Sequence, residues 1–191
     1  MSETNVPGLF VVKDFLTQDE EEKLLEEINK CEWKPNRSGE RRVQIYGPYH
    51  DQRYRIIPGK YSSHPDWVKK LAKKINNEMT QSKLSVSLSD GCEGKLLNEK
   101  TCEVYTNEYD KMDSLHYHFD HPVTYNNNIY GISLSSNASM GFKKGNKVVK
   151  VPVNRRSLYI MSGDSRTKYK HGIEKGWIEG KRVSVTFRTV R

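Results

Sequence analysis

The hydrophobic period of this chain changes near residue 100, and this change restricts the fold more than any other feature. Upstream, apolar residues recur with the spacing of amphipathic helices. Downstream, short segments alternate apolar and polar residues, with glycines between them. Helices followed by a run of short strands indicate an α+β chain, an antiparallel β-sandwich with the helices packed on one side. The expected strands are 101–109, 115–120, 130–135, 147–153, 157–161, a short piece around His171, and 182–188.

The upstream helices carry clear start signals. Thr17 and Glu20 have the spacing of a capping box, which predicts a helix that begins there and ends near Lys30. A second helix is expected to begin at Pro65-Asp66 and to bury Trp67, with lysines on its wet face. Residues 8–15, rich in Val and Phe, are predicted to form a strand before the first helix.

Length and composition bound the organisation of the chain. Its 191 residues suit one domain over 9–191, with helices in 9–100 and the sandwich in 101–191, after a flexible arm at 1–8. Without an apolar run long enough for a signal peptide or membrane span, we expect a location in the cytoplasm or nucleus and no membrane contact. We also expect a monomer. The net charge of +8 favours a polyanionic partner, although solubility alone would also explain it.

The first chemical signal is an H-x-D pair, His118 and Asp120. Residues i and i+2 of a strand point the same way, so the imidazole and the carboxylate converge. With His171 as a third ligand, the set would leave coordination positions open, as non-haem Fe(II) requires. A casual His–Asp contact on a surface strand would give the same pair, and other residues must separate these alternatives.

The segment 182–188 favours the metal site. Alternation places Arg182, Ser184, Thr186 and Arg188 on one face of a strand, with apolar residues on the other. Buried arginines are costly unless anions meet them, and a guanidinium matches a carboxylate in two parallel bonds. We therefore interpret this face as a site for a small dicarboxylate. Arg188 alone would also fit a surface strand.

A second polar face, Tyr105, Asn107 and Tyr109, has the same i, i+2, i+4 spacing. Its amide and phenols could hydrogen-bond the same dicarboxylate, or the face could simply be exposed to solvent.

Taken together, these segments resemble the AlkB family of dioxygenases. The resemblance rests on Asn107-Glu108-Tyr109, His118-Phe119-Asp120, residues 157–166, His171-Gly172-Ile173 and residues 182–188, which occur in the family's order and at family-like spacing. It covers 107–191 well and the upstream half more loosely.

The resemblance implies a double-stranded β-helix, or jelly-roll, core. It also implies an Fe(II)- and 2-oxoglutarate-dependent dioxygenase that consumes O2. The metal ligands would be His118, Asp120 and His171. The residues binding 2-oxoglutarate would be Asn107, Tyr109, Arg182, Ser184 and Arg188, with Arg182 on the distal carboxylate. Residues 154–158 and Ser184 are most similar to the branch with a tRNA wobble-uridine hydroxylase domain, of which this chain would be the catalytic domain only.

The resemblance places the family's nucleotide-recognition lid near residues 41–55. Interleaved arginines and tyrosines there could stack on a base and hold phosphates. We therefore expect oxidation of a nucleic-acid base, by N-demethylation or hydroxylation, with RNA, tRNA or single-stranded DNA favoured. The alternative is a protein-directed oxygenase with the same chemistry. The expected substrate-binding residues are Arg41, Arg42, Tyr46, Tyr49, His121 and Arg166.

Overall fold

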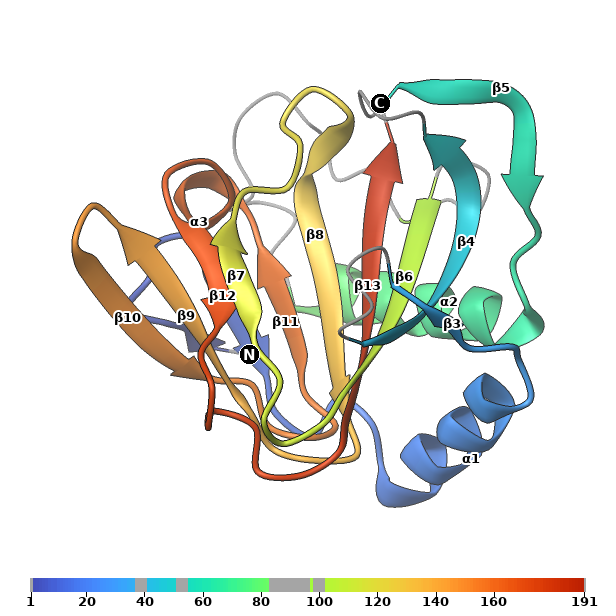
Figure 1. The fold of residues 1–191 in the computed structure, drawn as a ribbon, viewed down its shortest axis with the longest axis horizontal. Coiled ribbons are helices and arrows are strands. Elements are labelled where there is room, and N and C mark those ends of the chain that lie inside the picture. The colour runs from blue at the N-terminus through green and yellow to red at the C-terminus, as the bar shows by residue number, and fades with distance from the viewer. Residues whose placement is uncertain (1, 37–40, 51–54, 83–96, 98–101, 191) are drawn as a thin grey trace.

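A computed structural model of the chain describes residues 2–36, 41–50, 55–82, 97 and 102–190. Strands form two antiparallel sheets that face each other, and two helices pack against the outer face of the larger sheet (Figure 1). The expected α+β jelly-roll core with helices on one side is confirmed.

The larger sheet has nine strands, in the order β1-β2-β11-β8-β13-β6-β4-β3, with β5 paired to β4. Its centre is β13, which pairs with β6 on one side and β8 on the other. The strands are β1 (Ser2–Glu3), β2 (Leu9–Val12), β3 (Lys34–Pro35), β4 (Arg42–His50), β5 (Ile56–Ser62), β6 (Cys102–Tyr109), β8 (Tyr125–Leu134), β11 (Leu158–Met161) and β13 (Arg182–Val190).

The smaller sheet has four strands, in the order β10-β9-β12-β7. They are β7 (Leu115–His118), β9 (Ser139–Lys144), β10 (Lys147–Pro152) and β12 (Lys170–Ile173). The sequence did not predict β9. Gly141 and two adjacent lysines interrupt its alternation, whereas the strand is held by pairing with both β10 and β12.

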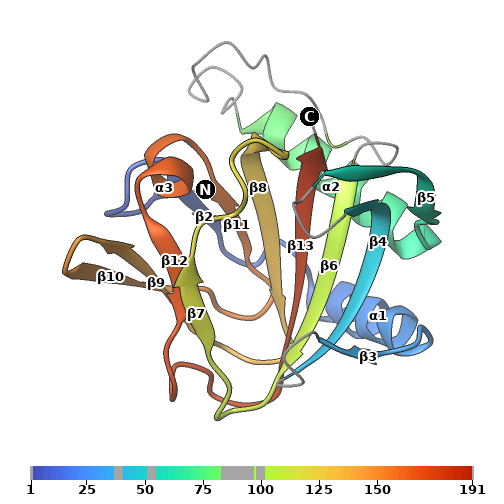
Figure 2. The ribbon, with the colours of Figure 1, turned by 45° about the horizontal axis from the view of Figure 1, so that its top comes forward.

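The helices begin where the sequence predicts. Helix α1 (Gln18–Asn29) is capped by Thr17, whose hydroxyl accepts from the Glu20 amide while the Glu20 carboxylate accepts from the Thr17 amide. Helix α2 (Asp66–Gln81) buries Trp67, Leu71 and Ile75. A short helix, α3 (Gly163–Thr167), was not predicted. Figure 2 shows α1 and α2 behind β6, β4 and their neighbours.

Two cores follow from this layering. One fills the space between α1, α2 and the larger sheet, where Ile28, Ile75 and Phe187 are fully buried. The other lies between the two sheets around Leu9, Ile129 and Phe142. Burial of side chains of this size contributes about 2 kcal/mol each relative to exposure.

The expectation of a flexible arm at residues 1–8 is wrong for the described residues 2–8. Strand β1 pairs with β2, and Val6 is completely buried between the sheets. The amides of Ser162 and Ser165 donate to the carbonyls of Gly8 and Pro7 at 2.9 Å. Backbone pairing with distant segments therefore fixes a stretch whose composition alone suggested fraying.

Membrane insertion through a helix finds no support in the described residues, since neither α1 nor α2 is both long and apolar enough to span a bilayer.

Candidate active site

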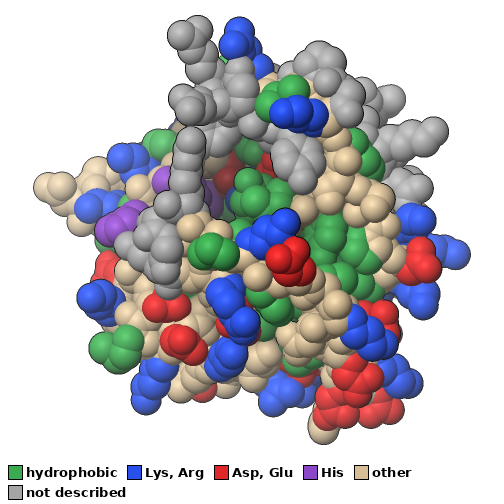
Figure 3. All heavy atoms as spheres, turned by 45° about the vertical axis from the view of Figure 1, so that its right-hand side comes forward, with side chains coloured by type: hydrophobic (Ala, Val, Ile, Leu, Met, Phe, Trp, Pro, Cys, Tyr) green, Lys and Arg blue, Asp and Glu red, His purple; other side chains and the backbone are tan. Residues whose placement is uncertain are grey.

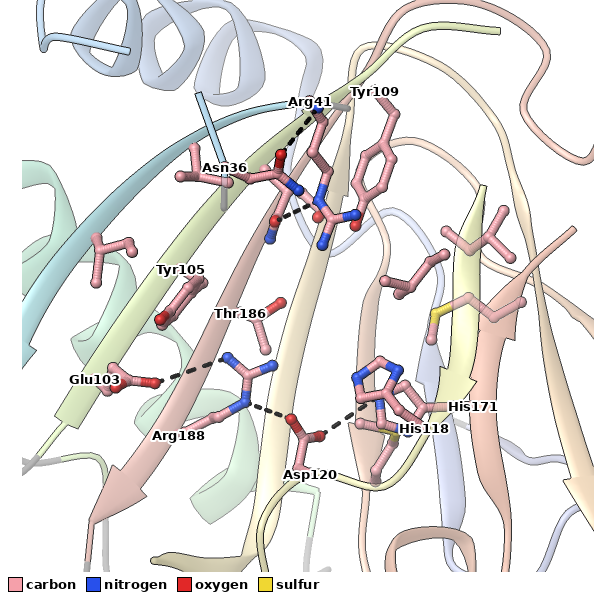
Figure 4. A pocket seen from close by; sticks show the side chains of 18 of the residues that line it. Asn36, Arg41, Glu103, Tyr105, Tyr109, His118, Asp120, His171, Thr186 and Arg188 are labelled. Atoms are coloured by element: carbon pink, nitrogen blue, oxygen red, sulfur yellow. Dashed lines mark hydrogen bonds and ion pairs between the residues drawn. The ribbon is translucent and has the colours of Figure 1, made fainter. Parts of the chain in front are cut away.

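A cavity of about 640 Å³ lies between the two sheets. The larger sheet contributes β6 and β13 to its floor, and β7 and β12 of the smaller sheet form a wall. In Figure 3, histidine and acidic side chains are visible in the depth of a hollow that apolar side chains edge. Figure 4 shows the labelled side chains pointing into this space, with Arg41 and Tyr109 at one end and His118, Asp120 and His171 at the other.

Three side chains at one end of the cavity could hold a metal ion. His118, Asp120 and His171 each offer one ligand atom, and these atoms lie within 4.8 Å of one another. Direct pairing of His118 with His171 across β7 and β12 brings the rings to 4.3 Å between centroids. Nδ1 of His118 lies 2.8 Å from the His116 carbonyl oxygen, which orients the ring so that Nε2 can face a metal.

The protonation states of Asp120 and His171 suit metal binding. Burial raises the pKa of Asp120, but Arg188 and then His171 outweigh it and hold the pKa at about 2. Burial lowers the pKa of His171 to about 3. At neutral pH the pair is therefore a carboxylate and a neutral imidazole, the forms that coordinate a metal.

Arg182 stands at the other end of β13, almost completely buried. Its Nε donates to the Ser133 hydroxyl at 3.0 Å, and its guanidinium lies 5.5 Å from the centre of the Tyr109 ring. Its Nη2 has no hydrogen-bond partner among the described residues. A buried cation with a free donor is costly, and an entering carboxylate would satisfy it.

Arg188, six residues along the same strand, faces the metal ligands. Its Nε donates to Oδ1 of Asp120 at 2.8 Å, while Glu103 lies 4.0 Å from its Nη1. Burial opposes the charge, but Asp120 and Glu103 outweigh it and raise the pKa of the guanidinium. Arg188 therefore fixes one carboxylate oxygen of Asp120 and leaves Oδ2, which has no hydrogen-bond partner among the described residues, turned toward His171 at 3.5 Å.

The donor set fits Fe(II) with a bidentate acid beside it. Two imidazoles and one carboxylate leave coordination positions open, and the orphaned oxygen of Asp120 is a ready ligand. The orphaned donor of Arg182, at the far end of the same polar face, fits the distal carboxylate of 2-oxoglutarate.

The polar face of β6 lies directly beside that of β13. Asn107 pairs with Ser184, and Tyr109 with Arg182, so all four side chains line the cavity as expected. Asn107 Oδ1 accepts from Nε of Arg41 at 3.2 Å, and the Arg41 guanidinium lies 5.3 Å from the centre of the Tyr109 ring. Arg41 thus reaches the cavity from the segment predicted to contact substrate.

Two other members of that segment do not reach the cavity. Arg42 is exposed and forms an ion pair with Glu108 at 2.6 Å, and Tyr46 packs edge-on against Trp67 in the helix-side core. Strand alternation explains this, because Val43 and Ile45 take the cavity side of β4. The expected roles of Arg42 and Tyr46 in substrate binding are therefore wrong. The side chain of Tyr49 and all of residues 51–54 lie outside the described residues.

The two downstream substrate candidates separate in the same way. His121 lines the cavity, half-buried, and its Nδ1 lies 2.8 Å from the Thr124 hydroxyl. Arg166 is buried on α3 and donates to the backbone carbonyls of Asp120 and His121 at 2.8 and 3.2 Å. Its expected contact with substrate is therefore wrong. It positions the loop that carries Asp120.

Sequence reasoning missed Tyr159 and Glu103, which both line the cavity. Tyr159 is buried beside Arg182, and its ring passes over Gly131, where a Cβ would lie 1.9 Å from it. Glu103 accepts from the Tyr125 hydroxyl at 2.7 Å. Glu103 continues the i, i+2 pattern of Tyr105 and Asn107, so that pattern could have revealed it.

Comparison with known proteins places this geometry in context. The model of the 2OG-Fe(II) oxygenase superfamily matches residues 8–188. The solved structure of OsALKBH1 superposes with a TM-score of 0.68 at 17% identity, covering 98% of this chain and 100% of that one, and so shares the fold.

Three relatives match nearly the whole chain. An uncharacterised protein, L905 of Acanthamoeba polyphaga mimivirus, is 32% identical over 97% of this chain and 86% of its own length. The DNA N6-methyl adenine demethylase of Caenorhabditis elegans is 28% identical, over 96% and 60%. The mouse tRNA (carboxymethyluridine(34)-5-O)-methyltransferase ALKBH8 is 30% identical, over 97% and 31%. The chain thus spans less than two thirds of the nematode and mouse proteins. The resemblance to the tRNA branch is distant.

Proposed function

Because this chain belongs to the 2OG-Fe(II) oxygenase superfamily and is AlkB-like within it, we propose that it oxidises a base of a nucleic acid. It is a 2-oxoglutarate-dependent dioxygenase, and its cofactors are Fe(II), 2-oxoglutarate and O2. The finer part of the proposal is the reaction, N-demethylation or hydroxylation, on RNA, tRNA or single-stranded DNA.

The residues of the cavity have separate proposed roles. His118, Asp120 and His171 would hold the iron, and Arg182 would anchor 2-oxoglutarate by its distal carboxylate, with Asn107, Tyr109 and Ser184 along its length. The bound iron, with 2-oxoglutarate and O2, supplies the oxidant for a C–H bond. The protein orients the groups, while Arg188 and Arg166 keep Asp120 in place.

The observation that carries the substrate proposal is the cavity mouth. The lining includes Ile45 and Phe119, both apolar and about 40% exposed, and, at the end opposite the iron ligands, the cation of Arg41. Such a mouth could sandwich a planar base and pair with its phosphate. The volume is in the range of small-molecule sites. Two relatives whose names specify DNA and tRNA substrates support the same class.

The test is nucleoside mass spectrometry. Purified protein with Fe(II), 2-oxoglutarate and ascorbate is incubated with total tRNA, mRNA and single-stranded DNA carrying N-methylated bases. We expect one modified nucleoside to be lost or hydroxylated, and no change with the Asp120→Ala variant. If all three pools stay unchanged while a peptide library stimulates succinate release, the protein-directed alternative replaces the proposal.

Two further parts of the proposal concern the oligomeric state and the cellular location. We expect the protein to run as a monomer in size-exclusion chromatography and to fractionate with the cytoplasm or nucleus, where RNA and DNA substrates occur.

A further inference from the structure

The positive charge of this chain is concentrated in one segment. Residues 139–175 carry ten Lys or Arg and only two acidic residues, so their net charge of +8 equals that of the whole chain. All other residues together are neutral. This segment includes β9, β10 and β12, three of the four strands of the smaller sheet. The lid segment, residues 41–55, carries four Arg and one Asp, so the larger excess of positive charge lies in the smaller sheet.

Lysines face each other across these strands. Lys143 of β9 pairs directly with Lys170 of β12 on the outer face, because their neighbours Phe142 and His171 pair on the inner side. Lys144 pairs with Lys147 of β10 on the opposite side of the sheet, the side of Phe142. Directly paired residues point to the same face, and like charges in such pairs are destabilising. The outer face thus carries one repulsive pair, Lys143 and Lys170, that an anion lying across β9 and β12 would relieve.

Aromatic rings hold two of the ammonium groups of the outer face. Lys143 lies 5.6 Å from the centre of the Tyr117 ring, and Lys150 lies 4.6 Å from the centre of the Trp177 ring. Both rings are half-buried. Glu174 adjoins this group and accepts from the Tyr117 hydroxyl at 2.8 Å. Alternating cations and rings are the composition that single-stranded nucleic acids bind, with phosphates on the cations and bases on the rings.

This face is continuous with the active site. Tyr117 precedes the metal ligand His118 on β7, and Lys170 precedes His171 on β12, so each strand carries a ligand inward beside a surface residue. The helices α1 and α2 pack on the far side of the other sheet, and none of the described helices lies across this face (Figure 1). A strand whose target base enters the cavity could therefore continue over β7, β12 and β9.

We propose that the outer face of the four-stranded sheet binds the phosphodiester backbone of a single-stranded nucleic acid that flanks the target base. Lys143 and Lys170 are its centre, and Lys150 of β10 extends it. This inference rests on the proposed function for the identity of the chain in the cavity, but the binding can be measured without turnover.

The experiment is fluorescence anisotropy with a labelled 12-nucleotide single-stranded RNA of mixed sequence. We expect the Lys143→Gln/Lys170→Gln variant to bind roughly tenfold more weakly, and the slope of log K against log salt to fall by about 1.4, since two phosphate contacts are lost. The matched control is Lys70→Gln/Lys73→Gln, which removes the same charge from the exposed face of α2. It should bind like the wild type.

Equal binding by both double variants, or no binding by the wild type, would overturn the inference. The inference would also be overturned if the wild type bound phosphatidylserine vesicles more tightly than the RNA and the Lys143→Gln/Lys170→Gln variant lost this preference. Failure of the proposed function has a different signature: RNA is bound through this face, yet no nucleoside in any pool is oxidised. Release of succinate without added substrate should be the same in all variants, which shows that the iron site is intact.

Discussion

The two sheets share one cavity but differ in their outer faces. The nine-stranded sheet turns its outer face to α1 and α2 and buries Val104, Ile132 and Val185 there. The four-stranded sheet turns Lys143, Lys150 and Lys170 outward on a face that α1 and α2 do not cover. Inside, the larger sheet provides the arginines and the smaller sheet provides the histidines. One sheet is thus a supported floor for the cosubstrate, and the other is a thin wall between the iron site and a basic surface.

The difference indicates that changes on the two faces of the thin wall should have separable effects. The largest effect is expected on its inner face. His118→Ala should reduce succinate formation to the background level, because two ligands remain of three. His116→Ala, an exposed imidazole on the same strand, should keep the activity. Similar losses of succinate formation in both variants would show that β7 tolerates no change. The inner and outer faces of the smaller sheet would then not have separable effects.

The next largest effect is expected in the nine-stranded sheet, which forms the floor of the cavity. Arg182→Met should raise the KM for 2-oxoglutarate roughly 100-fold, since a charge-assisted pair contributes about 3 kcal/mol. Stability without 2-oxoglutarate should not fall, because the guanidinium is buried with a free donor. Arg42→Met, an exposed arginine outside the cavity, is the control. An unchanged KM in Arg182→Met would show that 2-oxoglutarate does not bind at this end of β13.

A smaller effect concerns the stability of the fold at acidic pH. Burial holds the pKa of His171 at about 3, below its unfolded value near 6.5, so the unfolded chain binds a proton first as the pH falls. Stability from this residue is present above pH 6.5 and is lost as the pH falls toward 3. Between pH 7 and 5, the loss should be about 2 kcal/mol in metal-free protein.

Urea denaturation at pH 7 and 5 measures this loss. In His171→Gln the decrease should be smaller than in the wild type by that amount, whereas His116→Gln should behave like the wild type. Parallel pH profiles for His171→Gln and the wild type would contradict the assigned shift.

The smallest effect is on the outer face and has the opposite sign. Lys143→Gln/Lys170→Gln should raise the free energy of unfolding by up to about 1 kcal/mol at low salt, because a cross-strand repulsion is removed. The gain should vanish at high salt. Thermal melts beside Lys70→Gln/Lys73→Gln would test it. A destabilised double variant would mean that the two lysines serve the fold rather than a ligand.

Local rules predicted much of this structure. The capping box at Thr17, the alternation of residues 182–188 and the i, i+2 pair of His118 and Asp120 each depend on nearest neighbours in the chain. Those neighbours are the same before and after folding. His171 was also proposed as the third ligand from the sequence, and the family resemblance supplied the jelly-roll core.

What the sequence did not reveal depends on which face of an element meets which layer. Arg41 and Arg42 are adjacent and chemically alike, but strand parity puts one in the cavity and the other in solvent. Tyr46 looks like a stacking residue until Trp67, 21 positions away, is known to pack against it. Arg166 has the charge for a phosphate but is used on two backbone carbonyls. Such choices come from long-range packing.

The position of β13 has a consequence for how the protein is made. It is the last strand of the described chain, yet it lies between β6 and β8 at the middle of the larger sheet. During synthesis, β6 and β8 must wait as open edges, the kind of surface at which unfinished sheets associate wrongly. Insertion of β13 closes both edges and, in the same event, delivers Arg182 and Arg188 to the cavity. A nascent chain that could bind 2-oxoglutarate is therefore one whose sheet is already complete.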